Sequence, residues 1–79
     1  MGNIDPRDQT VRLLVSNLSD DQCTVSIEPL GGQVTLPKGE VFTVQVSGPG
    51  KGLVEVSYAT NGLVIGEWDG AITVLMNRQ

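Results

Sequence analysis

The feature of this chain that most constrains its fold is the regular interruption of short alternating runs. Between Thr10 and Asn77, apolar and polar residues alternate over a few positions at a time, and each run ends at a cluster of Gly, Pro, Asn or Asp. A period of two is typical of half-buried β-strands, and no run is long enough for a substantial helix. The sequence therefore predicts an all-β fold, a small antiparallel β-sandwich or partly open barrel of about seven short strands.

The alternation also indicates which side chains share a face in the clearest runs. Strands are expected at residues 10–16, 23–28, 33–36, 40–47, 53–60 and 71–77, with one more after Gly62. The expected apolar faces are Val11, Leu13 and Val15 in the first strand, Cys23, Val25 and Ile27 in the second, and Phe42, Val44 and Val46 in the fourth. Pro29 should end the second strand, and residues 36–39 should form a type I turn.

Asn61-Gly62 is the strongest hairpin signal in the chain. Both residues tolerate the positive φ of a two-residue type I′ turn. Pairing outward from that turn places Tyr58 opposite Ile65 and puts Val56 on the same face. The sequence thus predicts both a turn position and a register for this hairpin.

The same register leaves two positions for Trp68. Either a bulge at Gly66 turns the indole into the core, or Trp68 lies outside beside Val64 and Leu75. The second arrangement would form an exposed apolar strip, and such strips tend to be buried against a partner. Trp68, Val64, Leu75 and Tyr58 are therefore the candidate interaction surface.

A chain of 79 residues is expected to form one domain. Residues 1–9 are polar and aperiodic, so we expect a flexible N-terminal tail followed by a single β domain at 10–79. With one cysteine and no histidine, neither an internal disulfide nor a dedicated zinc site is expected. A small core usually needs a disulfide, a metal or a partner subunit for stability. Because the first two are not expected here, self-association is favoured.

Charge and composition exclude several classes of partner. The formal net charge is −4, and the five basic residues are scattered singly, which argues against binding nucleic acid. We see no export signal and no apolar run that could span a membrane, so the expected location is the cytoplasm. Cys23 is expected to be a buried, inert thiol in the same apolar register as Val25 and Ile27.

The sequence contains no recognisable catalytic constellation. Acyl-transfer triads usually need a histidine base, and there is none. The glycine-rich segment 48–52 lacks the spacing, the hydroxyl residue and the following helix of a phosphate-binding loop. The acidic residues are interpreted as solvated charges on strand faces or in turns. We therefore expect a protein that is not an enzyme and has no cofactor.

Four segments together carry a family resemblance. They are Glu28-Pro29-Leu30-Gly31, Leu36-Pro37-Lys38-Gly39-Glu40, Gly48-Pro49 and Gly66-Glu67-Trp68-Asp69-Gly70. In this order they resemble small uncharacterised bacterial single-domain β proteins with a Glu-Pro-Trp-Gly segment, a Pro-Gly-Glu turn and a late Gly-Trp segment. The chain departs from that pattern at Leu30, where the pattern has Trp, and at Glu67, which is inserted before Trp68. The resemblance implies the β fold and no function.

Two functional hypotheses follow. The first is a non-catalytic protein-interaction or structural module that acts through its sheet faces and edges as a homo-oligomer. The alternative is a small carbohydrate-type binding module that stacks its ligand on Trp68 and Tyr58. The chain has only one Trp, one Tyr and one Phe, and this scarcity of aromatic residues favours the first hypothesis. The identity of a protein partner or small-molecule ligand is left open.

Overall fold

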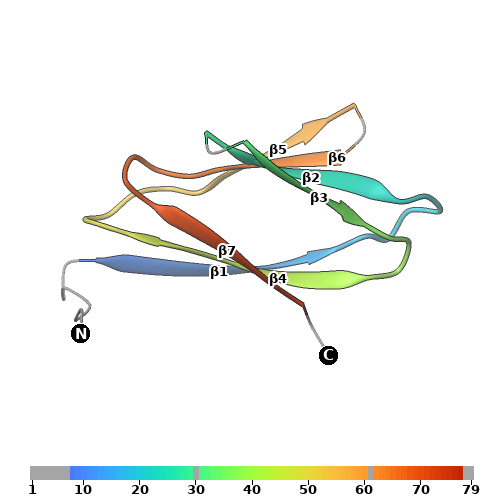
Figure 1. Ribbon diagram of the computed structural model, residues 1–79, viewed down its shortest axis with the longest axis horizontal. Helices are drawn as coiled ribbons and strands as arrows, with labels where there is room; N and C mark the ends of the chain where they lie inside the picture. Colours follow the sequence, from blue (N-terminus) through green and yellow to red (C-terminus); the bar gives the residue numbers. More distant parts are fainter. Residues whose placement is uncertain (1–7, 30, 61, 78–79) are drawn as a thin grey trace.

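The chain folds into two stacked β-sheets, seen edge-on in Figure 1. The computed structural model describes residues 8–29, 31–60 and 62–77. One sheet has three strands in the order β1 (Gln9–Ser16), β4 (Val41–Gly48), β7 (Ile72–Asn77). The other has four in the order β3 (Gly32–Leu36), β2 (Cys23–Glu28), β6 (Gly62–Gly66), β5 (Glu55–Ala59). The predicted all-β sandwich of seven strands is confirmed, and the sheets do not close into a barrel.

One strand pair differs from the predicted antiparallel arrangement. β2 and β6 run parallel, whereas the other neighbouring pairs are antiparallel. A parallel pair needs a long crossover connection. Here the chain between β2 and β6 forms β3 and β5 in the same sheet and β4 in the other sheet. Alternation within a strand indicates its faces and says nothing about its neighbours, so the sequence could not predict this pairing.

The core lies between the two sheets and is made of small aliphatic side chains. Its buried members are Val15, Val25, Ile27, Leu36, Val44, Val46, Ile65 and Ala71. Pairing places Val11 opposite Val46, Leu13 opposite Val44 and Val15 opposite Phe42, so the predicted inward faces of β1 and β4 are confirmed. The inward face of β2 is confirmed as well, with Val25 and Ile27 buried.

The outward position of Leu75, expected in one of the two alternatives for Trp68, is wrong. Leu75 pairs with Val44, whose side chain is fully buried, so Leu75 faces the core and not the outside. Ile72, Val74 and Met76 point outward and are exposed. The sequence is apolar on both faces of this run, so alternation alone cannot select the buried one, and pairing with β4 decides it.

The β5–β6 hairpin turns one residue earlier than predicted. Ala59 pairs with Gly62, so the two connecting positions are Thr60 and Asn61, of which Asn61 lies outside the described residues. Tyr58 pairs with Leu63 in place of the predicted Ile65. The partner has moved by two positions, and because side chains alternate with a period of two, the predicted face of Tyr58 is preserved.

Two further boundaries follow turn chemistry. β2 ends at Glu28, immediately before Pro29, as predicted. The turn between β3 and β4 is closed by a hydrogen bond from Glu40 N to Pro37 O, with Gly39 at φ +76°. It therefore spans residues 37–40 and needs a positive φ at its third position, which is the requirement of a type II turn and not of the predicted type I turn at 36–39.

Most of the predicted tail, residues 1–7, lies outside the described part of the chain. Gln9 belongs to β1, so the β domain begins one residue before the expected position 10. Its side-chain Oε1 accepts a hydrogen bond of 2.7 Å from Gly52 N. In the residues that the structure describes, no helix is long and apolar enough to cross a membrane.

Candidate functional site

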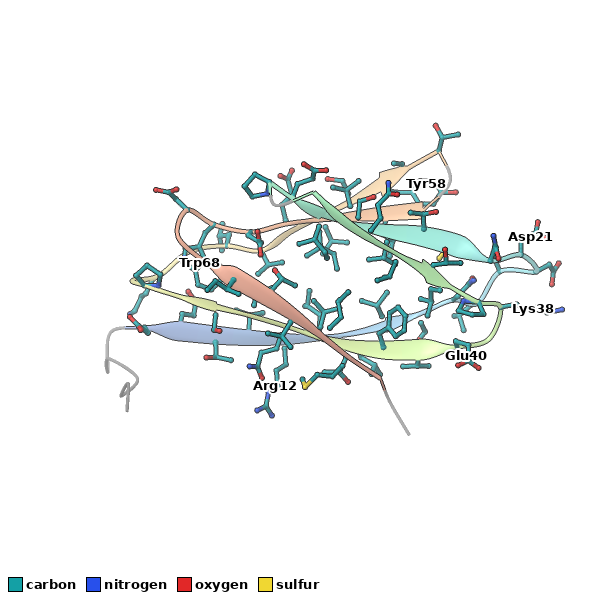
Figure 2. The ribbon with its side chains drawn as sticks, in the orientation of Figure 1. Arg12, Asp21, Lys38, Glu40, Tyr58 and Trp68 are labelled. Atoms are coloured by element: carbon teal, nitrogen blue, oxygen red, sulfur yellow. The ribbon has the colours of Figure 1, made fainter. Side chains whose placement is uncertain are left out.

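The four residues of the predicted interaction surface do not form one surface. Leu75 faces the core from the three-stranded sheet. Val64 is half-buried on the outward side of the four-stranded sheet, opposite Ser57 and Ser26. Trp68 and Tyr58 lie at opposite ends of the sandwich (Figure 2). The predicted strip is therefore corrected, because it depended on an outward Leu75 that pairing with β4 rules out.

Trp68 follows the end of β6 and packs partly buried against the core. Its indole Nε1 donates a hydrogen bond of 3.0 Å to Pro49 O in the β4–β5 connection. Gly52 lies against the ring so closely that a Cβ there would be 2.2 Å from Trp68 Cγ. The indole therefore holds the 48–52 segment at one end of the sandwich. It packs against the core, as in the first predicted position, but strand pairing through Gly66 is regular and the predicted bulge is not present.

Replacing Gly52 with alanine should displace the indole and lower the free energy of unfolding by about 1–3 kcal/mol. Chemical denaturation measures this loss, and because Trp68 is the single tryptophan, its fluorescence maximum reports the displacement. Gly66→Ala is the matched control, since a Cβ there would meet Glu55 Cβ at an ordinary 3.5 Å. Equal losses in the two variants would contradict the proposed packing.

Asn17 organises the opposite end of the sandwich, and sequence reasoning did not single it out. It is 4% exposed. Its Nδ2 donates to Leu36 O at 2.9 Å and to Asp21 O at 2.7 Å, and its Oδ1 accepts from Ser19 N at 2.9 Å. Its backbone bonds the β3–β4 turn, from Asn17 N to Glu40 O and from Gly39 N to Asn17 O. The side-chain amide of Asn17 thus connects the β1–β2 loop to the end of β3, and its backbone connects the loop to the β3–β4 turn.

The loop that Asn17 holds forms one wall of a groove. The groove has a volume of about 710 Å³ and lies between the β1–β2 loop and the β5–β6 hairpin. The apolar or aromatic side chains that line it are those of Leu18, Cys23, Tyr58 and Leu63. Asp20 and Asp21 are the charged residues among its described lining residues, and Asp21 and Tyr58 lie at the same end of the molecule (Figure 2).

Tyr58 is exposed although it lies on the core-facing side of its sheet. β5 pairs with β6 so that Val56 and Tyr58 share the face of Ile65. Ile65 is 0% exposed, whereas Val56 is 53% and Tyr58 86% exposed. The four-stranded sheet therefore extends beyond the three-stranded sheet at β5, which stands away from the lower layer in Figure 1. The hairpin signal predicted this shared face, but not that it is left uncovered.

A second exposed apolar surface lies on the outward side of the three-stranded sheet. We call it the outer patch, and its members are Leu14 (59% exposed), Ile72 (62%), Val74 (47%) and Met76 (38%). Thr43 pairs with both Leu14 and Met76, so these three side chains form one row across β1, β4 and β7. The next row is Arg12, Gln45 and Val74, in which Arg12 Nε donates to Gln45 Oε1 at 3.1 Å.

Two further side chains with reactive groups, Cys23 and Glu67, are described by the structure. Cys23 is half-buried on a wall of the groove, more accessible than the predicted buried thiol. Glu67 is half-buried and not the solvated charge that was expected: its Oε2 accepts a hydrogen bond from Thr73 Oγ1, and its Oε1 is buried without a partner among the described residues. No group of three or more metal-ligating side chains occurs among the residues described.

Comparison with known family models, with curated proteins and with solved structures gave no match. The resemblance to small bacterial β proteins stays a prediction.

Proposed function

We propose that this protein is a non-catalytic interaction module that associates with a second copy of itself through the outer patch. The observation that carries the proposal is the gathering of four exposed, large apolar side chains on one face of one sheet. Monomeric proteins rarely expose a contiguous apolar surface of substantial size without a function. The small aliphatic core gives a further reason, because domains of this length often gain stability from a partner subunit.

The polarity of this face supports a second copy as the partner. The outward positions of β1, β4 and β7 carry a single charge among their described side chains, that of Arg12, on a protein whose net charge is −4. Arg12 points away from the other sheet (Figure 2) and lies in the row of Val74. A nearly uncharged face offers little attraction to a strongly charged partner. It can meet its own copy in a twofold interface that combines the apolar side chains of β7 with the uncharged polar side chains of β4.

The carbohydrate-type alternative receives less support from the geometry. A stacking site of that type would use Trp68 and Tyr58 together, and these side chains lie at opposite ends of the sandwich (Figure 2). Trp68 also directs its indole N–H at Pro49 O and its ring at Gly52. Tyr58 alone remains as an exposed aromatic platform, so we do not propose sugar binding.

The test is the oligomeric state of an outer-patch variant. Wild-type protein is expected to sediment as a dimer at about 100 μM. The double variant Ile72→Thr/Val74→Thr should weaken the dimer about 100-fold or more, because a twofold interface loses four apolar side chains. Threonine keeps the β-branched shape, so the far-ultraviolet circular dichroism of the variant should match that of wild type.

Leu53→Thr is the matched control, since Leu53 is also exposed but lies in the β4–β5 connection. It should leave the sedimentation coefficient unchanged. A wild-type monomer at about 100 μM would overturn the proposal. So would a dimer that persists in the double variant, because its interface would lie elsewhere.

A further inference from the structure

The groove is bordered by Tyr58 of β5, which is an edge strand of the four-stranded sheet. β5 pairs with β6 on one side, and no described strand pairs with its other side. An edge strand presents unpaired N–H and C=O groups that can accept another strand. Next to this edge, the inward side chains of Val56 and Tyr58 are exposed, so an added strand would find apolar surface as well as hydrogen-bonding groups.

The charge of the groove indicates which kind of polypeptide would bind as an added strand. Among the described lining residues the charged ones are Asp20 and Asp21, both acidic, and no basic residue balances them there. A polypeptide that carries Lys or Arg on its inward face would therefore be favoured over an acidic one. Nucleic acid and anionic membranes, which carry negative charge, are disfavoured by the same carboxylates.

We infer that the free edge of β5 and the adjoining groove dock a basic, extended polypeptide segment, which adds to the four-stranded sheet as a fifth strand. A basic side chain of the segment lies beside Tyr58 and faces Asp20 and Asp21. An apolar side chain two residues away lies beside Val56, because alternate residues of a strand share a face. The backbone ladder supplies affinity and the spacing of basic and apolar residues supplies specificity. This site is separate from the outer patch and does not depend on self-association.

The test uses a fluorescein-labelled peptide of eight residues, with threonine at odd positions and valine and lysine in turn at even positions. Fluorescence polarisation should show saturable binding in the micromolar range, as expected for a small interface, and the binding should weaken with added salt. A peptide with glutamate in place of lysine should bind at least about tenfold more weakly. A peptide with the same side chains and an N-methylated backbone should not bind, because it has no amide donors.

Variants of the protein locate the site. Asp20→Asn/Asp21→Asn and Tyr58→Ser should each weaken binding about five- to tenfold. Asp69→Asn, an exposed charge in the β6–β7 turn at the other end, should have no effect. Saturating peptide should also slow amide hydrogen exchange in β5, because the added strand pairs with its free edge. All of these chains are expected to stay folded, because Asp20, Asp21, Tyr58 and Asp69 are exposed.

Several outcomes would overturn the inference. Equal binding of the lysine and glutamate peptides would remove the charge argument, and equal binding of the methylated peptide would remove strand addition. Unchanged hydrogen exchange in β5 would place the peptide elsewhere. A changed sedimentation coefficient of Tyr58→Ser without peptide would show that a second copy occupies the groove. Ile72→Thr/Val74→Thr should bind the peptide like wild type, which separates this inference from the proposed dimer.

Discussion

Gly62→Ala is expected to unfold the protein or to lower its free energy of unfolding by about 3 kcal/mol or more, close to the whole stability of a domain this size. A Cβ at position 62 would lie 1.8 Å from Thr24 O and 2.7 Å from Thr24 C. These are backbone atoms of the neighbouring strand, so they cannot move aside as the end of a side chain could. The parallel β2–β6 pair would have to separate where Thr24 meets Gly62, and this pair joins the two halves of the four-stranded sheet.

Gly32→Ala is the matched control for this prediction. Gly32 also begins a strand of the same sheet, but a Cβ there meets no atom within 4 Å, and its φ is not in the left-handed region. Its change should lie within about 0.5 kcal/mol of wild type. Thermal and urea denaturation followed by circular dichroism measure both variants. If Gly62→Ala were as stable as Gly32→Ala, the close approach of β2 and β6 would be refuted.

Asn17→Ala should lower the free energy of unfolding by about 2–4 kcal/mol, because each buried group that loses its partner costs about 1–3 kcal/mol. The substitution leaves the buried Leu36 O and the Asp21 O without their amide donor, and Ser19 N without its acceptor. Urea denaturation measures the loss. Because the amide connects the β1–β2 loop to the end of β3, the loss should be accompanied by faster hydrogen exchange in residues 17–22.

Asn17→Asp tests whether the NH₂ group of the Asn17 side chain is needed for stability. It keeps an oxygen acceptor for Ser19 N but places a carboxylate oxygen against Leu36 O and Asp21 O, so its loss should be at least as large as that of alanine. Ser19→Ala removes only the hydroxyl that donates to Asn17 Oδ1 and Asp21 O, keeps the amide donor of Asn17, and should cost less than about 1 kcal/mol. Near wild-type stability of the Asn17→Asp variant would refute the donor role of the amide.

Turn residues in the sequence predicted part of the candidate site. Asn61-Gly62 predicted a hairpin with Val56 and Tyr58 on the face of Ile65, and that shared face is confirmed. The predicted role of Gly62 was wrong. The glycine allows the close approach of Thr24, and its φ is not positive. Asn17 lies in a run that predicts only a turn. Its partners at Leu36 and Glu40 are distant in the sequence, so no local pattern indicates that its amide is buried.

The sequence by itself determined the class of secondary structure, the positions of the strands to within a residue or two, and the inward faces of β1, β2 and β4. These properties are local, since alternation and turn residues act over a few positions. The tertiary structure alone decided the parallel β2–β6 pair, the inward turn of Leu75, the position of Trp68 at one end, and the uncovered face beside Tyr58. Each of these depends on which strands become neighbours and where one sheet ends over the other. That outcome is set by the free energy of the whole packed core, which no single run of residues contains.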